Sequence, residues 1–99
     1  LICGTGSIGK RHINNSLSLN LEVLIWRMRS NIKNDLKNFK NISIIENLDE
    51  AINRSDCVIV ATATNYHDFI ISRVMKFNRP IYIEKPISNK INIFNKLKK

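Results

Sequence analysis

The sequence has only three glycines, two prolines and two cysteines in its 99 residues. Two cysteines cannot build the disulfide framework of a small secreted domain. Cys3 and Cys57 both fall inside expected strands, so we predict two buried, unpaired thiols in the cytoplasm, although thiols on adjacent strands could approach each other. Apolar runs are also short: none nears the roughly 20 residues that a membrane span needs, and no signal peptide is recognisable. We therefore expect no membrane association.

Acidic residues are scarce as well, with 8 Asp and Glu against 16 Lys and Arg, which gives a net charge of +8. Such an excess occurs in proteins that bind nucleic acid, anionic lipid or phosphorylated ligands. Here the basic residues are spread along the chain, and no basic stripe is interleaved with aromatic side chains. Together with the abundance of Asn, Ile and Lys, this spread indicates a compositional bias, and we expect no specific nucleic-acid partner.

The glycines are concentrated in one segment, Gly4-Thr5-Gly6-Ser7-Ile8-Gly9. This G-x-G-x-x-G pattern follows an apolar stub that reads as a strand end and precedes a predicted helix from Ser7 to Leu19. Gly4 would allow the tight turn, Gly6 would let the backbone approach a pyrophosphate, and Gly9 would let the helix pack closely on the strand. Backbone N–H groups and the helix dipole favour an anion there. A glycine loop that binds nothing is the alternative.

The rest of the chain alternates between apolar runs and amphipathic segments. Further strands are expected at Leu21–Trp26, Ile42–Ile45, Cys57–Ala61 and Ile81–Ile83, and further helices at 31–39, 47–53, 65–77 (with Asn65 as its cap) and 89–99. This alternation implies right-handed crossovers and a parallel sheet that is covered on both faces. We predict an α/β fold: one Rossmann-type, doubly wound domain over residues 1–99, with about five parallel strands.

Both ends of the sequence look truncated. Three residues precede Gly4, whereas a parallel strand normally has about five or six. The last predicted helix ends without a cap and without a following strand. We therefore expect a fragment of a longer protein.

Four segments, in this order and spacing, together resemble one family: Gly4–His12, Leu48–Ile52, Ala61–His67 and Glu84–Pro86. The chain is similar over essentially its whole length to the cofactor-binding domain of the glucose–fructose oxidoreductase and inositol 2-dehydrogenase (Gfo/Idh/MocA) family. It departs from the family at Ala63, where proline is frequent. The family's C-terminal substrate domain, with its catalytic histidine and much of the sugar pocket, is absent.

The resemblance implies a set of site residues. Gly4, Gly6, Ser7, Ile8 and Gly9 would line the pyrophosphate and ribose, and Thr62, Ala63, Thr64, Asn65 and His67 would border the nicotinamide half of the groove. Glu84 and Lys85 would lie beside the nicotinamide ribose, with Lys85 reaching the substrate hydroxyl as the catalytic residue. These loops all follow strands, which agrees with the rule that ligands bind outside the carboxyl ends of the strands in open α/β sheets.

Several of these residues also have simpler interpretations. Lys85 could be an ordinary lysine at a strand end, and His67 is expected to be a cofactor-edge or structural residue more than a catalytic base. Glu84 could orient a ribose or pair with Lys85. His12 is expected on the first helix, in contact with the sheet or a neighbouring loop. No Cys/His spacing typical of a metal site is present, so we expect no metal.

The segment Ile25-Trp26-Arg27-Met28-Arg29-Ser30 bears on the choice of cofactor. An NAD-selective site usually has an acidic residue about 20 residues beyond the glycine loop, where it binds the ribose 2′-hydroxyl. No acid occurs here before Asp35. Arg27 or Arg29 could instead hold a 2′-phosphate, with Ser30 donating a further hydrogen bond. We therefore expect NADP more than NAD, and solvated surface arginines are the alternative.

The leading functional prediction is the NAD(P)-binding domain of an oxidoreductase. The full-length protein would transfer hydride between the nicotinamide cofactor and a sugar, cyclitol or nucleotide sugar, and it would be a homo-oligomer. The 99-residue chain alone is expected to be inactive. The alternative is a non-catalytic module that binds a dinucleotide or a partner protein.

Overall fold

A computed structural model describes residues 1–27 and 41–85 of the chain. Their strands form one parallel sheet in the order β3-β2-β1-β4-β5. The elements are β1 (Ile2–Cys3), α1 (Ser7–Ser18), β2 (Val23–Trp26), β3 (Ile42–Ile44), α2 (Leu48–Arg54), β4 (Val58–Val60), a short 3₁₀ turn η2 (Thr64–Tyr66), α3 (His67–Lys76) and β5 (Ile81–Ile83). The predicted five-stranded α/β Rossmann-type fold is confirmed. The helices predicted at 31–39 and 89–99 lie outside the described residues.

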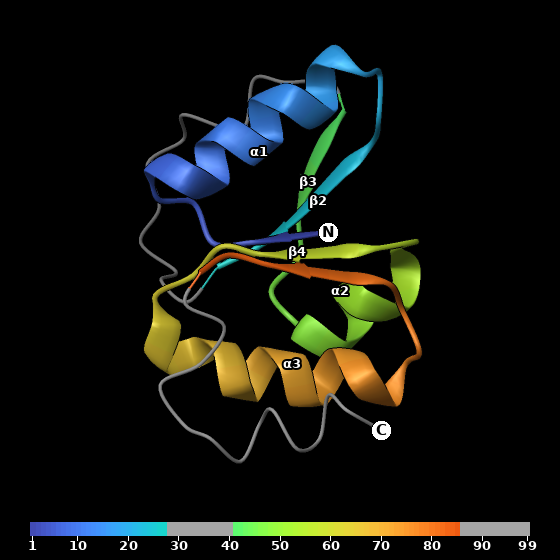
Figure 1. Cartoon of the computed structure of the whole chain (residues 1–99). Coiled ribbons are helices and arrows are strands. Elements are labelled where there is room, and N and C mark those ends of the chain that lie inside the picture. The colour runs from blue at the N-terminus through green and yellow to red at the C-terminus, as the bar shows by residue number, and fades with distance from the viewer. Residues whose placement is uncertain (28–40, 86–99) are drawn as a thin grey trace.

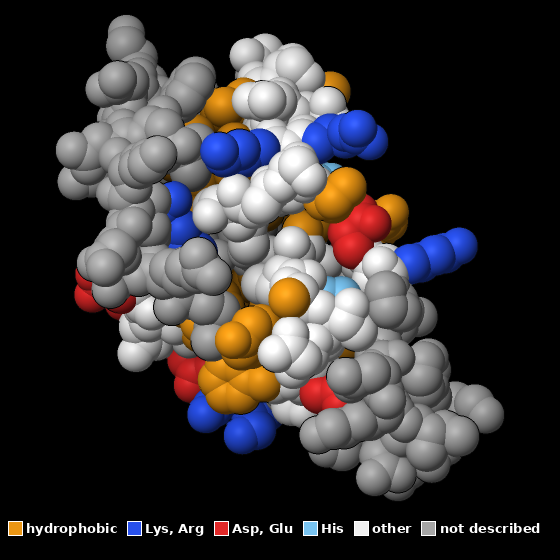
Figure 2. All heavy atoms as spheres, turned by 90° about the vertical axis from the view of Figure 1, so that its left-hand side faces the viewer, with side chains coloured by type: hydrophobic (Ala, Val, Ile, Leu, Met, Phe, Trp, Pro, Cys, Tyr) orange, Lys and Arg blue, Asp and Glu red, His pale blue; other side chains and the backbone are white. Residues whose placement is uncertain are grey.

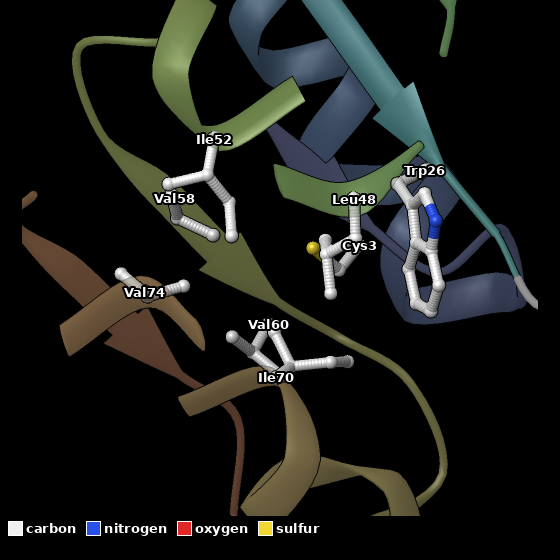
Figure 3. Close-up of a cluster of buried hydrophobic side chains, with 8 residues drawn as sticks. All are labelled: Cys3, Trp26, Leu48, Ile52, Val58, Val60, Ile70 and Val74. Carbon is white, nitrogen blue, oxygen red and sulfur yellow. The ribbon is translucent and has the colours of Figure 1, made fainter. Parts of the chain in front are cut away.

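Helices cover both faces of the sheet: α1 lies on one side, and α2 and α3 lie on the other (Figure 1). Side chains alternate between faces along each strand, so every strand contributes to two cores. The core under α1 contains Ile2, Ile13, Val23 and Ile25. The core under α2 and α3, drawn in Figure 3, contains Cys3, Trp26, Leu48, Ile52, Val58, Val60, Ile70 and Val74. These opposed apolar faces make the sheet a buried central layer.

The helix ends follow local capping rules, with one correction to the sequence prediction. Helix α1 ends because Asn20 adopts a left-handed conformation (φ 60°), so that Leu21 N donates to Ser16 O at 3.1 Å. At the start of α2, the Asn47 side chain accepts from Glu50 N at 2.9 Å. The prediction that Asn65 caps α3 is wrong. Asn65 lies within η2, where Tyr66 N bonds Ala63 O, and α3 starts at His67.

The two cysteines differ in their surroundings. Cys3 is fully buried, and this burial raises the pKa of its thiol to about 12. Cys57 is exposed, which corrects the prediction of two buried thiols, because β4 starts only at Val58. Both cysteines are free. Within the described residues, no helix combines the length and apolar character needed to cross a membrane.

Candidate functional site

The carboxyl ends of the strands meet at one edge of the sheet. Cys3 is paired with both Trp26 and Val60, and Val60 is paired with Ile83, so the last residues of four strands lie side by side. The segments that follow these strands therefore lie together at this edge. They are the glycine loop, Arg27, the 61–66 loop and Glu84-Lys85. This edge is on the left of Figure 1 and faces the viewer in Figure 2. The sheet order reverses between β1 and β4, which is where open α/β sheets form a ligand crevice.

Two of the three glycines are required by close packing. Gly4 has φ +108°, and a Cβ on it would lie 2.6 Å from Ala61 O. A Cβ on Gly9 would meet the backbone of Gly4, 2.7 Å from its carbonyl carbon. Around Gly6, by contrast, a Cβ would find nothing within 4 Å. Gly4 and Gly9 thus hold the loop against β4 and α1, while Gly6 leaves exposed backbone at the crevice.

The start of α1 is suited to an anion. Gly6 is the N-cap residue and provides no side-chain hydrogen bond, and the first turn carries no acidic residue. The first backbone bond of the helix runs from Lys10 N to Gly6 O (2.9 Å), so the amides of Ser7, Ile8 and Gly9 precede the helical hydrogen-bond ladder. Gly6, Ser7 and Ile8 are exposed. The helix dipole adds positive potential at these amides.

His67 supports the loop after β4 from beneath. Its side chain is only 1% exposed, and Nε2 lies 2.9 Å from Thr62 O. Because a carbonyl oxygen can only accept, Nε2 carries the proton in this contact. Thr62 and Thr64 are half-buried, and Ala63 and Asn65 are exposed at the crevice. His67 therefore makes a structural contact with this loop, and its place at the edge of a bound cofactor stays a prediction.

The segment after β5 is held from two directions. Glu84 N donates to Val60 O at 3.0 Å, and Glu84 Oε1 lies 2.6 Å from His12 Nε2. The ring of His12 also makes an edge contact with Tyr82, with centroids 5.7 Å apart. His12 thus contacts the sheet and a neighbouring segment, as expected, whereas the carboxylate of Glu84 pairs with His12. The Lys85 side chain is exposed at the same edge.

Arg27 directly follows β2 and is half-buried. Its neighbour Trp26 accepts a hydrogen bond from Gly4 N at 2.9 Å, which brings Arg27 next to the glycine loop. Arg29 and Ser30 lie outside the described residues. Sequence reasoning missed a further contact, from Trp26 Nε1 to Glu46 O at 3.0 Å, which ties the end of β3 to the end of β2. In the sequence, this contact could have been inferred only from a tryptophan at the end of a buried strand, because a buried indole N–H needs a hydrogen-bond acceptor.

The described residues contain no group of three or more His, Cys, Asp or Glu side chains that could hold a metal ion. At the crevice, the structure offers exposed amides at the start of α1, the loop after β4, and Lys85. Arg29 and Ser30 lie outside the described residues, and the structure brings the other sequence-predicted site residues, apart from His67, to this one edge. His67 lies under it and does not face it.

The fold has close relatives among solved structures. A UDP-N-acetylglucosamine 3-dehydrogenase from Acidithiobacillus ferrooxidans aligns with a TM-score of 0.85 at 17% identity, over 98% of this chain and 31% of its own. A dehydrogenase from Clostridium difficile gives 0.80 at 17% identity, over 97% and 33%. The apo scyllo-inositol dehydrogenase from Lactobacillus casei gives 0.71 at 19% identity, over 96% and 30%. The chain therefore spans about a third of the length of these proteins.

Comparison with known sequences gives the family. No curated protein matches the chain. The family described as "Oxidoreductase family, NAD-binding Rossmann fold" (GFO_IDH_MocA) matches residues 1–99, which is the whole sequence. The match includes both the glycine loop and the Glu84-Lys85 segment that meet at the crevice. With the Rossmann fold and the family match in agreement, the chain belongs to the Gfo/Idh/MocA oxidoreductase family and forms its NAD-binding Rossmann fold.

Proposed function

We propose that this chain binds a nicotinamide dinucleotide across the crevice between β1 and β4 and provides the cofactor half of a sugar or cyclitol oxidoreductase. The observation that carries the proposal is the open backbone at Gly6. A Cβ there would meet nothing within 4 Å, although the glycines on either side of it are tightly packed. Exposed amides at a helix start, with space in front of them, fit a pyrophosphate.

Each segment at the edge has a role in this proposal. The amides of Ser7, Ile8 and Gly9 bind the pyrophosphate, and the exposed residues Ala63 and Asn65, with Thr62 and Thr64, border the nicotinamide ribose. The cofactor, when bound, supplies hydride transfer. Lys85 follows β5 by two residues, and we propose that its amine holds or moves the proton of a substrate hydroxyl there. The two named neighbours that act on a nucleotide sugar and a cyclitol support this class of substrate.

NADP is the proposed cofactor, with NAD as the second choice. Arg27 is the described residue that supports it, because it follows β2 beside the glycine loop. A guanidinium at this position can hold a 2′-phosphate by charge-assisted hydrogen bonds. Arg29 and Ser30 are proposed to assist, on sequence position alone. A cytoplasmic location and a homo-oligomeric full-length protein stay predictions.

The test is calorimetric titration of the chain with NADP⁺ and NAD⁺, comparing the unchanged sequence with Gly6→Asp and Asn14→Asp. Aspartate is a favourable N-cap residue, so Gly6→Asp should keep α1 folded while its carboxylate repels the pyrophosphate. Asn14→Asp adds the same charge on an exposed part of the same helix. We expect Gly6→Asp to weaken dinucleotide binding by at least about 10-fold, equivalent to about 1.4 kcal/mol, and Asn14→Asp to have little effect. Equal affinities for the two variants would contradict the proposal.

A further inference from the structure

We infer that His12 is a positioning residue for the nicotinamide end of the crevice. Through Glu84, its ring couples the helix that starts at the pyrophosphate subsite to the strand end that carries Lys85. This inference rests on the proposed function and deepens it, because it assigns a role to a side chain that itself lies behind the crevice. It also changes the role of Glu84 from a direct ligand of the ribose to the support of its neighbour.

The contact between His12 and Glu84 is short and long-range. Nε2 and Oε1 are 2.6 Å apart, and the two residues are separated by 72 positions in the sequence. The side chains are 19% and 29% exposed, so the pair is largely shielded from water. A shielded hydrogen bond to a carboxylate is stronger than an exposed ion pair, since solvent screens it less. The pair therefore fixes the distance between α1 and the end of β5.

The ring of His12 is held on a second side by β5. Tyr82 and Glu84 are two positions apart and point to the same face of the sheet, toward α1. The rings of His12 and Tyr82 meet edge-on, 5.7 Å apart and at 65°. On α1, His12 is next to Ile13, which is buried in the core under this helix. With its backbone held by packing and its ring held by Tyr82, His12 presents Nε2 to Glu84 in one orientation.

Glu84 is in turn anchored at both its backbone and its side chain. Its amide bonds Val60 O on β4 at 3.0 Å, and its carboxylate bonds His12 on α1. Lys85 is the next residue, and its side chain is exposed at the crevice. Because α1 also carries the amides of the glycine loop, the position of Lys85 is tied to the same helix that binds the pyrophosphate. The residues that bind the two ends of the dinucleotide thus share one rigid support.

The experiment separates positioning from stability by using two ligands. NADP⁺ and 2′-phospho-ADP differ by the nicotinamide and the ribose that carries it, so only the first reports the Lys85 end of the crevice. His12→Leu removes the hydrogen bond and keeps apolar bulk, His12→Gln retains an N–H donor, and Asn14→Ala is the matched control on an exposed part of α1. We expect His12→Leu to weaken NADP⁺ binding about 10-fold, the effect of losing one charge-assisted hydrogen bond, and 2′-phospho-ADP binding less than about 2-fold. His12→Gln should recover most of the NADP⁺ affinity.

Glu84→Gln provides a second, isosteric variant in case His12→Leu fails to fold. It should also weaken NADP⁺ binding and leave 2′-phospho-ADP binding unchanged, and its effect should not add to that of His12→Leu. Equal weakening of both ligands, or no weakening of NADP⁺, in either folded variant would overturn the positioning role. If the unchanged chain bound neither ligand, the proposed function would itself fail, and this inference with it.

Discussion

The packing around the glycine loop predicts opposite consequences for two alanine substitutions only three residues apart. In Gly9→Ala, the new Cβ would lie against the backbone of Gly4, 2.7 Å from its carbonyl carbon. Neither partner is a flexible side chain, so α1 must shift away from the loop. Overpacking of this kind costs about 1–3 kcal/mol and sometimes more. We expect the free energy of unfolding to fall by at least that amount.

In Gly6→Ala, two small effects offset each other. The backbone of Gly6 (φ −70°, ψ −170°) is accessible to alanine, and nothing lies within 4 Å of the new Cβ. Replacing glycine at such a position stabilises by about 0.4–1 kcal/mol through the unfolded chain. Alanine is a poorer N-cap than glycine by a similar amount. The net change in stability should therefore be near zero, while the methyl group obstructs the crevice and weakens dinucleotide binding.

The assay is urea unfolding of both variants, followed by circular dichroism, together with thermal melting. For a chain of this size each kcal/mol of destabilisation lowers the melting temperature by about 4–8 °C, so the two variants are easily distinguished. The same samples are then titrated with NADP⁺. An unchanged unfolding midpoint for Gly9→Ala, or a loss of more than about 1 kcal/mol in Gly6→Ala, would refute the reasoning, since a change of that size is characteristic of buried positions.

Five further predictions concern the crevice and the core. Arg27→Ala should weaken NADP⁺ by about 10-fold and leave NAD⁺ nearly unchanged in parallel titrations, and equal effects would identify Arg27 as ordinary surface charge. Lys85→Ala should lower turnover of the full-length protein by roughly 10²-fold at saturating substrate. His67→Ala should cost about 1–3 kcal/mol in urea unfolding, because Thr62 O loses its donor. Burial raises the pKa of the Cys3 thiol from 9.0 to about 12, so between these pH values this thiol ionises only in the unfolded chain. The free energy of unfolding should therefore fall as pH rises through that interval. A thiol reagent should meanwhile label Cys57 and not Cys3 in the folded chain.

The order and type of the described elements could be predicted because apolar runs and turn residues carry that information locally. The apolar residues before Gly4 and those at Val58–Val60 both form interior strands of the sheet. Element ends were less accurate, because ladder pairing and core packing set them. Cys57 extends an apolar run in the sequence, yet β4 begins after it. Asn65 is a good cap residue by type, but it lies within the 3₁₀ turn at Thr64–Tyr66, which precedes α3 in the chain.

The site could be predicted only in part, for a similar reason. The glycine spacing is a local pattern, and its geometry follows from a turn between a strand and a helix. The partner of Glu84 has no such signal, since His12 is 72 residues away and only the completed sheet brings the two together. From the sequence, the expected partners of Glu84 were the cofactor ribose, which the family resemblance implies, and Lys85, which is the next residue. The actual partner is near in space.

The central position of β1 has a consequence for how the site comes into existence during synthesis. Ile2 is made well before its partner Ile59 on β4, and His12 is made well before its partner Glu84, which follows β5. Pairings so distant in sequence require a large loop to close and form slowly. The crevice between β1 and β4 therefore has only one side until β4 has left the ribosome. A dinucleotide can stabilise the finished sheet, but it has nothing to bind while the first half is folding.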